Sequence, residues 1–246
     1  MNRGILNEKD LIKHLNGKRY CELNGNLKKF IKFIFDYIND YDFIYAGKIN
    51  NLYKTDIFVR VRDNEKYISV KIGSENSVHV EKLESFILFL ENNYVNKSII
   101  NYLKLYHYGD DSLDGKGEYR FSAEESKIKY RSEISKFNKY INHNNLLIAL
   151  IDRFLFLGTN DKNKNVDFIY YGDVNYGIWA SRMEIINYLI KNKCYHMRTI
   201  HFSSLTYQNW CRNINRNTNS ELRRNYIQIK WFSIVSDLQK IRNKEI

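Results

Sequence analysis

Proline is absent from this 246-residue sequence, cysteine occurs only three times, and no apolar run approaches the length of a transmembrane helix. The cysteines Cys21, Cys194 and Cys211 are isolated from one another, so neither a disulfide framework nor a zinc knuckle is expected. The first residues also lack the hydrophobic stretch of a signal peptide. We therefore expect a cytoplasmic protein without a membrane partner. The missing proline beside abundant Asn, Lys, Ile and Tyr indicates an AT-rich, bacterial source.

Acidic side chains are fewer than basic ones: the sequence has 28 Asp and Glu and 39 Lys and Arg. Its formal net charge is therefore +11. A surplus of this size favours a polyanionic partner, although a generic basic surface would look the same. Nucleic acid is favoured over a membrane because 15% of the residues are aromatic and no basic amphipathic segment stands out. The 43% hydrophobic content is ordinary for a folded chain.

Two strand-like runs, residues 54–61 and 67–72, follow each other across a polar turn. Antiparallel pairing would bring Asp56, at the start of the first run, to Lys71 near the end of the second. Ser69 and Lys71 alternate with apolar residues, so they project from one face of their strand. A carboxylate and a lysine at one sheet edge can hold a divalent cation beside a phosphate and orient the attacking water. The alternative is an exposed hairpin in which these polar residues only form the solvent-facing side.

These residues resemble the PD-(D/E)XK nuclease superfamily, and in particular restriction endonucleases in which Ser-x-Lys replaces the acid-x-Lys pair and a glutamate has moved to the following helix. The resemblance covers residues 45–92. Asp56 matches the metal-binding aspartate, Lys71 the lysine and Ser69 the vacated acid position, while Thr55 stands where the family often has proline. The resemblance implies Mg²⁺ as cofactor, an α/β core with a central mixed sheet flanked by helices, and a homodimer acting on double-stranded DNA at a palindromic site.

The displaced glutamate is sought on a helix predicted from Ser77 to Asn92. Glu84 falls at the polar margin of the apolar stripe of this helix, whereas Glu81 points farther toward solvent but lies nearer the loop that leaves Lys71. We favour Glu84, because the Ser-x-Lys subgroup carries its glutamate at a similar distance beyond the lysine. Either residue could instead be a solvated carboxylate that complements the helix dipole. The predicted metal ligands are therefore Asp56 with Glu84 or Glu81.

The rest of the chain predicts peripheral helices and further strands around this core. Helices are predicted near residues 8–16, 26–39, 96–107, 122–140, 144–157, 181–192 and 233–242, and strands near 166–172, 198–204 and 225–232. Residues 108–115 hold three aspartates but lack the glutamate of an EF-hand loop, so a turn is predicted there instead of a calcium site. No repeat or linker divides the sequence, so we predict a single α/β domain over residues 1–246.

Residues 198–232 form the predicted DNA-contact region. A loop-like stretch within this region, residues 207–224, contains four arginines: Arg212, Arg216, Arg223 and Arg224. The strand predicted after it places Gln228 and Lys230 on one face. Arginine binds phosphate, a glutamine amide can bond an adenine edge bidentately, and lysine can donate to guanine or phosphate. A solvated connection is the alternative. Gln228-x-Lys230 also imitates the nuclease pattern, but it lacks a partner aspartate at hairpin distance.

The sequence thus predicts a Mg²⁺-dependent type II restriction endonuclease that hydrolyses phosphodiester bonds and needs no organic cofactor. Its six histidines form no nuclease pattern, so histidine-centred chemistry is not expected. Two alternatives stay open: a DNA- or RNA-binding protein without catalytic activity, and a nuclease that acts on RNA or on damaged DNA in repair.

Overall fold

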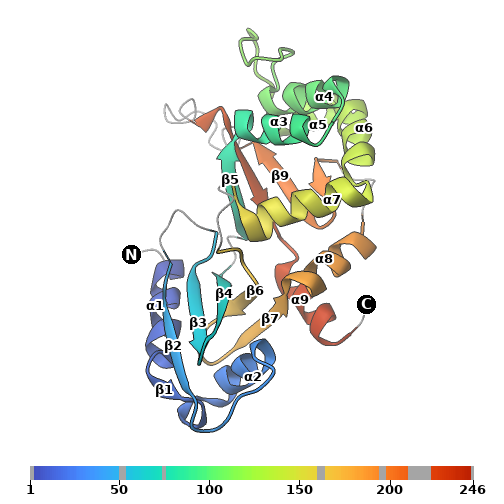
Figure 1. The fold of residues 1–246 in the computed structure, drawn as a ribbon. Helices are drawn as coiled ribbons and strands as arrows, with labels where there is room; N and C mark the ends of the chain where they lie inside the picture. The colour runs from blue at the N-terminus through green and yellow to red at the C-terminus, as the bar shows by residue number, and fades with distance from the viewer. Residues whose placement is uncertain are drawn as a thin grey trace. The chain divides into compact units, whose positions relative to one another are not determined.

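The computed structural model describes residues 3–49, 54–73, 76–159, 164–193, 198–209 and 223–244 (Figure 1). The chain folds as two compact units. Unit 1 comprises Met1–Asn76, Leu155–Tyr188 and Ser233–Ile246, and unit 2 comprises Ser77–Phe154 and Leu189–Phe232. Each unit is assembled from separate stretches of the chain. For this reason no single linker marks the division, and the sequence suggested one domain.

Unit 1 contains a six-stranded mixed sheet within the described residues, in the order β1-β2-β3-β4-β6-β7. The strands are β1 (Lys18–Arg19), β2 (Phe43–Lys48), β3 (Ile57–Val61), β4 (Asn64–Lys71), β6 (Phe168–Gly172) and β7 (Gly177–Ser181). All neighbours are antiparallel except β4 and β6, which are parallel. The predicted mixed sheet is therefore confirmed, while β2 and β7 were not predicted.

The β3–β4 hairpin confirms the local sequence pattern, with a tighter turn than predicted. Val61 pairs with Asn64, so only two residues form the turn. Arg62 has a left-handed backbone (φ 53°), which is the conformation that two-residue hairpin turns require. Its guanidinium donates to both carboxylate oxygens of Asp42, at 3.1 and 2.6 Å. This pair holds the turn against the residues that lead into β2.

Helices α1 (Arg3–Leu15) and α2 (Gly25–Ile34) supply the apolar residues that cover one face of this sheet. Leu11, Leu15, Leu27, Phe30 and Ile31 are buried together with Ile44, Val59, Ile68, Tyr170 and Trp179. Burying each such aliphatic or aromatic side chain contributes roughly 1.5–3 kcal/mol. Helix α9 (Ile234–Arg242) packs beside β7, and α8 (Arg182–Lys191) follows that strand.

The described part of unit 2 contains a four-stranded antiparallel sheet in the order β5-β10-β9-β8. Its strands are β5 (Ser77–Lys82), β8 (His201–Phe202), β9 (Leu205–Asn209) and β10 (Tyr226–Lys230). The helix predicted from Ser77 is therefore wrong in its first part: residues 77–82 form β5, and helix α3 spans Leu83–Asn92. Pairing with β10, about 150 residues away in sequence, overrides the local helical spacing.

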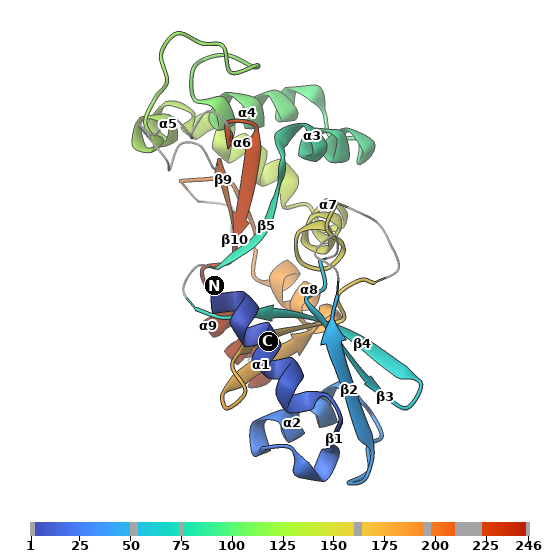
Figure 2. The ribbon, with the colours of Figure 1, turned by 90° about the vertical axis from the view of Figure 1, so that its left-hand side faces the viewer.

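Helices α4 (Lys97–Tyr108), α5 (Ala123–Lys129), α6 (Arg131–Ile141) and α7 (Asn144–Ile151) complete unit 2, and α7 continues into a π-helical stretch at Asp152–Leu157. Figure 2 shows α3 to α6 gathered at one end of the strands of this unit. Phe86 of α3 packs edge-on against Phe202 and at 6.5 Å from Tyr207, so this helix covers the core face of the sheet. Among the residues described, no helix is long and apolar enough to cross a membrane.

Candidate active site

The structure brings Asp56, Ser69 and Lys71 together at the open end of the β3–β4 hairpin. The Ser69 hydroxyl donates to Asp56 Oδ2 at 2.9 Å, and the Lys71 ammonium donates to the same oxygen at 3.2 Å. The backbone N–H of Val70 donates to it as well, at 2.7 Å. Both charged side chains are 24% exposed, so a ligand can reach them.

Backbone pairing explains why these side chains meet. The Asp56 N–H donates to Ile68 O and the Ile49 N–H donates to Asp56 O, which ties Asp56 to both neighbouring strands just before β3 begins. Thr55, which precedes Asp56, is buried and donates to Lys164 O at 2.6 Å. The Asp56 carboxylate is therefore held by its backbone pairing, the Val70 N–H and the buried Ser69 hydroxyl, whereas the Lys71 contact depends on a long, flexible side chain.

Glu8 of α1 is a further acidic residue at this site, and the sequence analysis missed it. Its side chain is 13% exposed and lies 3.2 Å from the Lys48 ammonium at the end of β2. Burial raises the pKa of Glu8, the Asp56 carboxylate raises it further, and Lys48 and Lys71 partly offset both effects. Glu8 thus shares one electrostatic environment with Asp56 and Lys71. No local motif marks it, because the unpredicted strand β2 carries its partner.

The oxygen donors at this site suit Mg²⁺. Within the described ranges, no group of three or more His, Cys, Asp or Glu side chains could hold a metal ion. Mg²⁺, however, keeps several waters and is usually bound by one or two carboxylates together with substrate phosphate oxygens. Asp56 and Glu8 offer two partly buried carboxylates, and mutual repulsion between them would fall if a cation bound nearby. These two side chains are the donors that would hold the ion.

Glu81, the second choice for the displaced ligand, is buried on β5 of unit 2. Its side chain is 2% exposed and accepts from Arg153 at 3.0 and 2.5 Å, while His79 Nε2 lies 3.0 Å from it. Burial acts to raise the pKa of Glu81, but the hydrogen bonds from His79 and Arg153 outweigh burial and leave the pKa below its ordinary value. Glu81 is therefore committed to a buried ion pair.

Glu84 lies in the first turn of α3, where it is exposed and complements the helix dipole. It belongs to unit 2, whereas Asp56 and Lys71 belong to unit 1. Its role as metal ligand stays a prediction.

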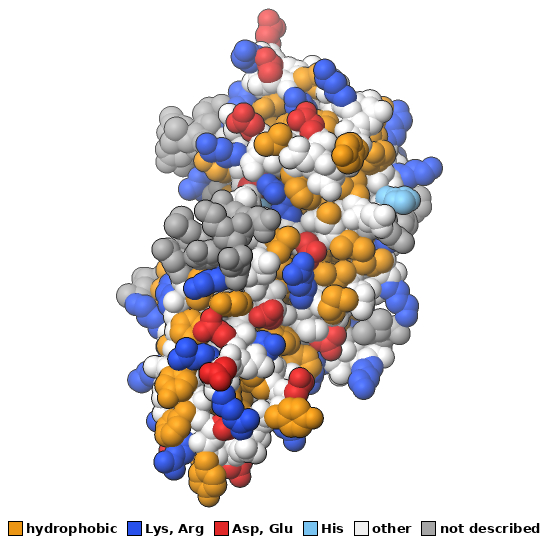
Figure 3. Space-filling model, viewed as in Figure 1, with side chains coloured by type: hydrophobic (Ala, Val, Ile, Leu, Met, Phe, Trp, Pro, Cys, Tyr) orange, Lys and Arg blue, Asp and Glu red, His pale blue; other side chains and the backbone are white. Residues whose placement is uncertain are grey.

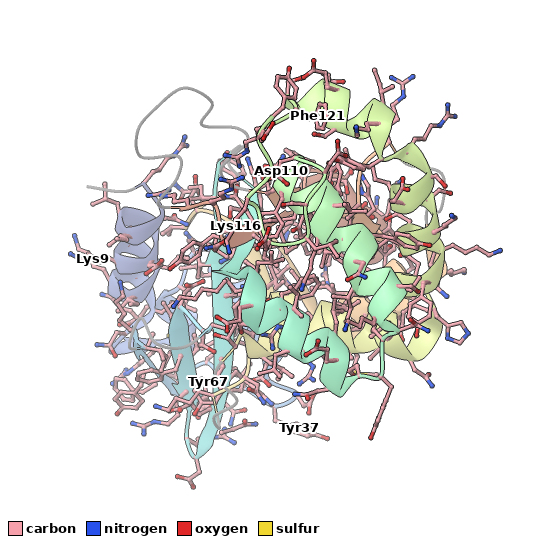
Figure 4. All side chains as sticks on the ribbon, turned by 90° about the horizontal axis from the view of Figure 1, so that it is seen from above. Lys9, Tyr37, Tyr67, Asp110, Lys116 and Phe121 are labelled. Atoms are coloured by element: carbon pink, nitrogen blue, oxygen red, sulfur yellow. The ribbon has the colours of Figure 1, made fainter. Side chains whose placement is uncertain are left out.

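The predicted DNA-contact residues fall into two groups. Arg212 and Arg216 lie outside the described residues. Arg224 donates to the buried Asp110 carboxylate at 2.8 Å, so it anchors the loop that follows α4. Figure 4 labels Asp110 together with Lys116 and Phe121 of the same loop. Asp110 also accepts the backbone N–H groups of Ser112 and Gly117, as expected for a turn.

Gln228 and Lys230 lie on the half-exposed face of β10, opposite the face that packs in the core. Gln208 of β9 pairs directly with Gln228, so two amides stand side by side. Gln228 Nε2 donates to Ser77 Oγ at 2.9 Å, and the Lys230 ammonium lies 5.6 Å from the centre of the Phe232 ring. Arg223 is exposed just before this strand.

No model of a known protein family matches the sequence, and comparison with curated proteins finds no relative. The functional argument therefore depends on the geometry of the site.

Proposed function

We propose that this protein is a Mg²⁺-dependent endonuclease that hydrolyses double-stranded DNA, and specifically a type II restriction enzyme acting as a homodimer on a palindromic site. The observation that carries the proposal is the convergence of Ser69 and Lys71 on one oxygen of Asp56, with Glu8 in the same electrostatic environment. The net charge of +11 supports a polyanionic substrate.

Each side chain has a role in this proposal. Asp56 and Glu8 hold the cation, and the Ser69 hydroxyl keeps the Asp56 carboxylate oriented. When bound, Mg²⁺ polarises a phosphoryl oxygen and acidifies a coordinated water. The Lys71 ammonium orients the attacking water and offsets the negative charge that develops as the new P–O bond forms and the old one breaks. The attacking water gives up a proton to solvent, and the leaving oxygen takes up a proton from solvent.

The open face of β10 and β9 is the proposed base-reading surface. The paired amides of Gln228 and Gln208 can each bond an adenine edge, and Lys230 can donate to guanine or to a phosphate. Arg223, exposed beside them, is suited to phosphate. Gln228→Ala should therefore weaken binding to the cognate site by about 1–3 kcal/mol and leave binding to random duplex nearly unchanged.

The test is a digest of plasmid DNA of known sequence with Mg²⁺ and, in parallel, with EDTA. Discrete bands that appear only with Mg²⁺ support the proposal, and end mapping then defines the site. Binding of duplex without any cleavage would indicate a DNA-binding protein instead. Cleavage of RNA alone, or of damaged duplex alone, would indicate a nuclease that acts on RNA or on damaged DNA in repair.

A further inference from the structure

One face of the β2–β3–β4 sheet in unit 1 carries aromatic rings that the core does not use. Along β2, Ile44 and Ala46 are buried while Phe43 and Tyr45 point the other way and are 46% and 45% exposed. Helices α1 and α2 cover the opposite face. In Figure 3, where Figure 1 draws β2 and β3, hydrophobic, basic and acidic side chains are interspersed on the surface.

The register extends this aromatic face across three strands. Gly47 pairs with Phe58, which in turn pairs with Tyr67. A Cβ on Gly47 would lie 2.5 Å from the Phe58 ring, so only glycine lets this ring lie across β2. Tyr67 lies on the same face as Phe58, because the two residues are paired directly across the strands. Phe43, Tyr45, Phe58 and Tyr67 form what we term the aromatic face.

Two arginines stand against these rings. The Arg60 guanidinium lies 5.3 Å from the centre of the Tyr45 ring, and Arg19 of β1 lies 5.3 Å from that of Phe43. Glu65 pairs with Arg60 across the strands and bonds the Tyr67 hydroxyl. Arginine and aromatic planes thus alternate within reach of one another, a combination suited to stacking and to phosphate contact.

The aromatic face is continuous with the candidate active site. Asp56 precedes Phe58 by two residues on the same face, and Ser69 follows Tyr67 by two residues. Alternate residues of a strand are about 6.6 Å apart, so the partly exposed Asp56 lies one such step from Phe58, whereas Ser69 is buried.

We infer that the aromatic face binds an unpaired nucleic-acid strand beside the Asp56–Lys71 site. Bases inside a duplex are already stacked on one another, so exposed aromatic rings can stack only with unpaired bases. The arginines beside the rings supply the complementary charge for the strand's phosphates. This inference rests on the proposed function only in taking nucleic acid as the substrate, because binding to the face needs neither metal nor cleavage.

The test measures binding of a short single strand that contains 2-aminopurine, in EDTA, by anisotropy and by quenching of the base fluorescence. Tyr45→Ala and Phe43→Ala should each weaken binding by about 5-fold or more and reduce the quenching, since stacking contributes ~1–3 kcal/mol per base. Tyr45→Phe should bind as the wild type does. Tyr176→Ala is the matched control, since Tyr176 is 84% exposed at the β6–β7 turn.

Wild-type affinity and quenching in Tyr45→Ala and Phe43→Ala would overturn the inference. So would a dimer, seen by sedimentation, that these two variants dissociate, because the occupant would then be a second copy. Failure of the proposed function looks different: single-strand binding and its loss in the variants would persist, with no Mg²⁺-dependent cleavage by the wild type.

Discussion

Two acid–base pairs, one in each unit, differ in what surrounds them. Asp56 and Lys71 are each 24% exposed and share one contact of 3.2 Å, whereas Glu81 and Arg153 are 2% and 12% exposed and share two. The Glu81 carboxylate also accepts from His79, so its oxygens are satisfied inside the protein. The three hydrogen bonds from Ser69, Val70 and Lys71 to the Asp56 carboxylate all end on Oδ2. A reactive site needs accessibility, while a structural pair needs burial.

The largest expected effect is on cleavage. Asp56→Asn and Lys71→Ala should each lower the rate by orders of magnitude while folding and duplex binding are retained, because each removes a group proposed to act at the reacting phosphate. Rates come from single-turnover cleavage of a short duplex. Asp63→Asn, at the exposed turn of the same hairpin, is the control. A rate above about a tenth of the wild-type value in either site variant, which is a loss of only ~1.4 kcal/mol, would contradict the assignment.

The buried pair should instead affect stability. Arg153→Met leaves the Glu81 carboxylate buried without its bidentate partner, so the free energy of unfolding should fall by about 3–5 kcal/mol. Urea unfolding measures this loss. The double variant Glu81→Gln, Arg153→Met should recover most of it, because neither buried charge then remains. An unchanged midpoint in Arg153→Met would mean that the pair is not structural.

Metal dependence distinguishes the three glutamates. Glu8→Gln should raise the Mg²⁺ concentration needed for half-maximal cleavage by about 10-fold or more, since it removes one of two proposed donors. Metal titrations of Glu84→Gln and Glu81→Gln complete the comparison. If Glu84→Gln alone shifts the titration, the displaced ligand predicted from the family resemblance is correct and Glu8 is not a donor.

Unit 2 should lose stability in mild acid. Burial lowers the pKa of His201 to about 4, so the unfolded chain takes up a proton below its ordinary pKa near 6.5 while the folded protein does not. The contribution of neutral His201 to the free energy of unfolding is therefore fully present well above pH 6.5. It is lost as the pH falls toward 4, and the free energy of unfolding should be lower by about 2 kcal/mol at pH 5. Urea unfolding at pH 7 and pH 5 measures the fall. His201→Asn should remove about that much of the pH dependence, and an identical dependence in the variant would exclude His201 as its source.

The smallest effect concerns salt. If Arg223 touches phosphate, Arg223→Ala should reduce the log-log salt slope of duplex binding by about 0.9, the value for one contact. Arg224→Ala should leave the slope unchanged and lower stability instead, because its guanidinium is bound to buried Asp110. Anisotropy titrations at several salt concentrations separate the two. Equal slopes for both variants and the wild type would remove Arg223 from the interface.

Local sequence determined the β3–β4 hairpin and the meeting of Asp56, Ser69 and Lys71, because alternating apolar residues and a short turn set the register without distant contacts. Only the tertiary structure determined where Glu81 and Glu8 lie and which residues they contact. Pairing of β5 with β10 turned residues 77–82 into a strand and buried Glu81 against Arg153. Packing of α1 beside β2 brought Glu8 to the site. Contacts between segments so far apart in the chain leave no periodicity in a local window, so only the assembled structure reveals them.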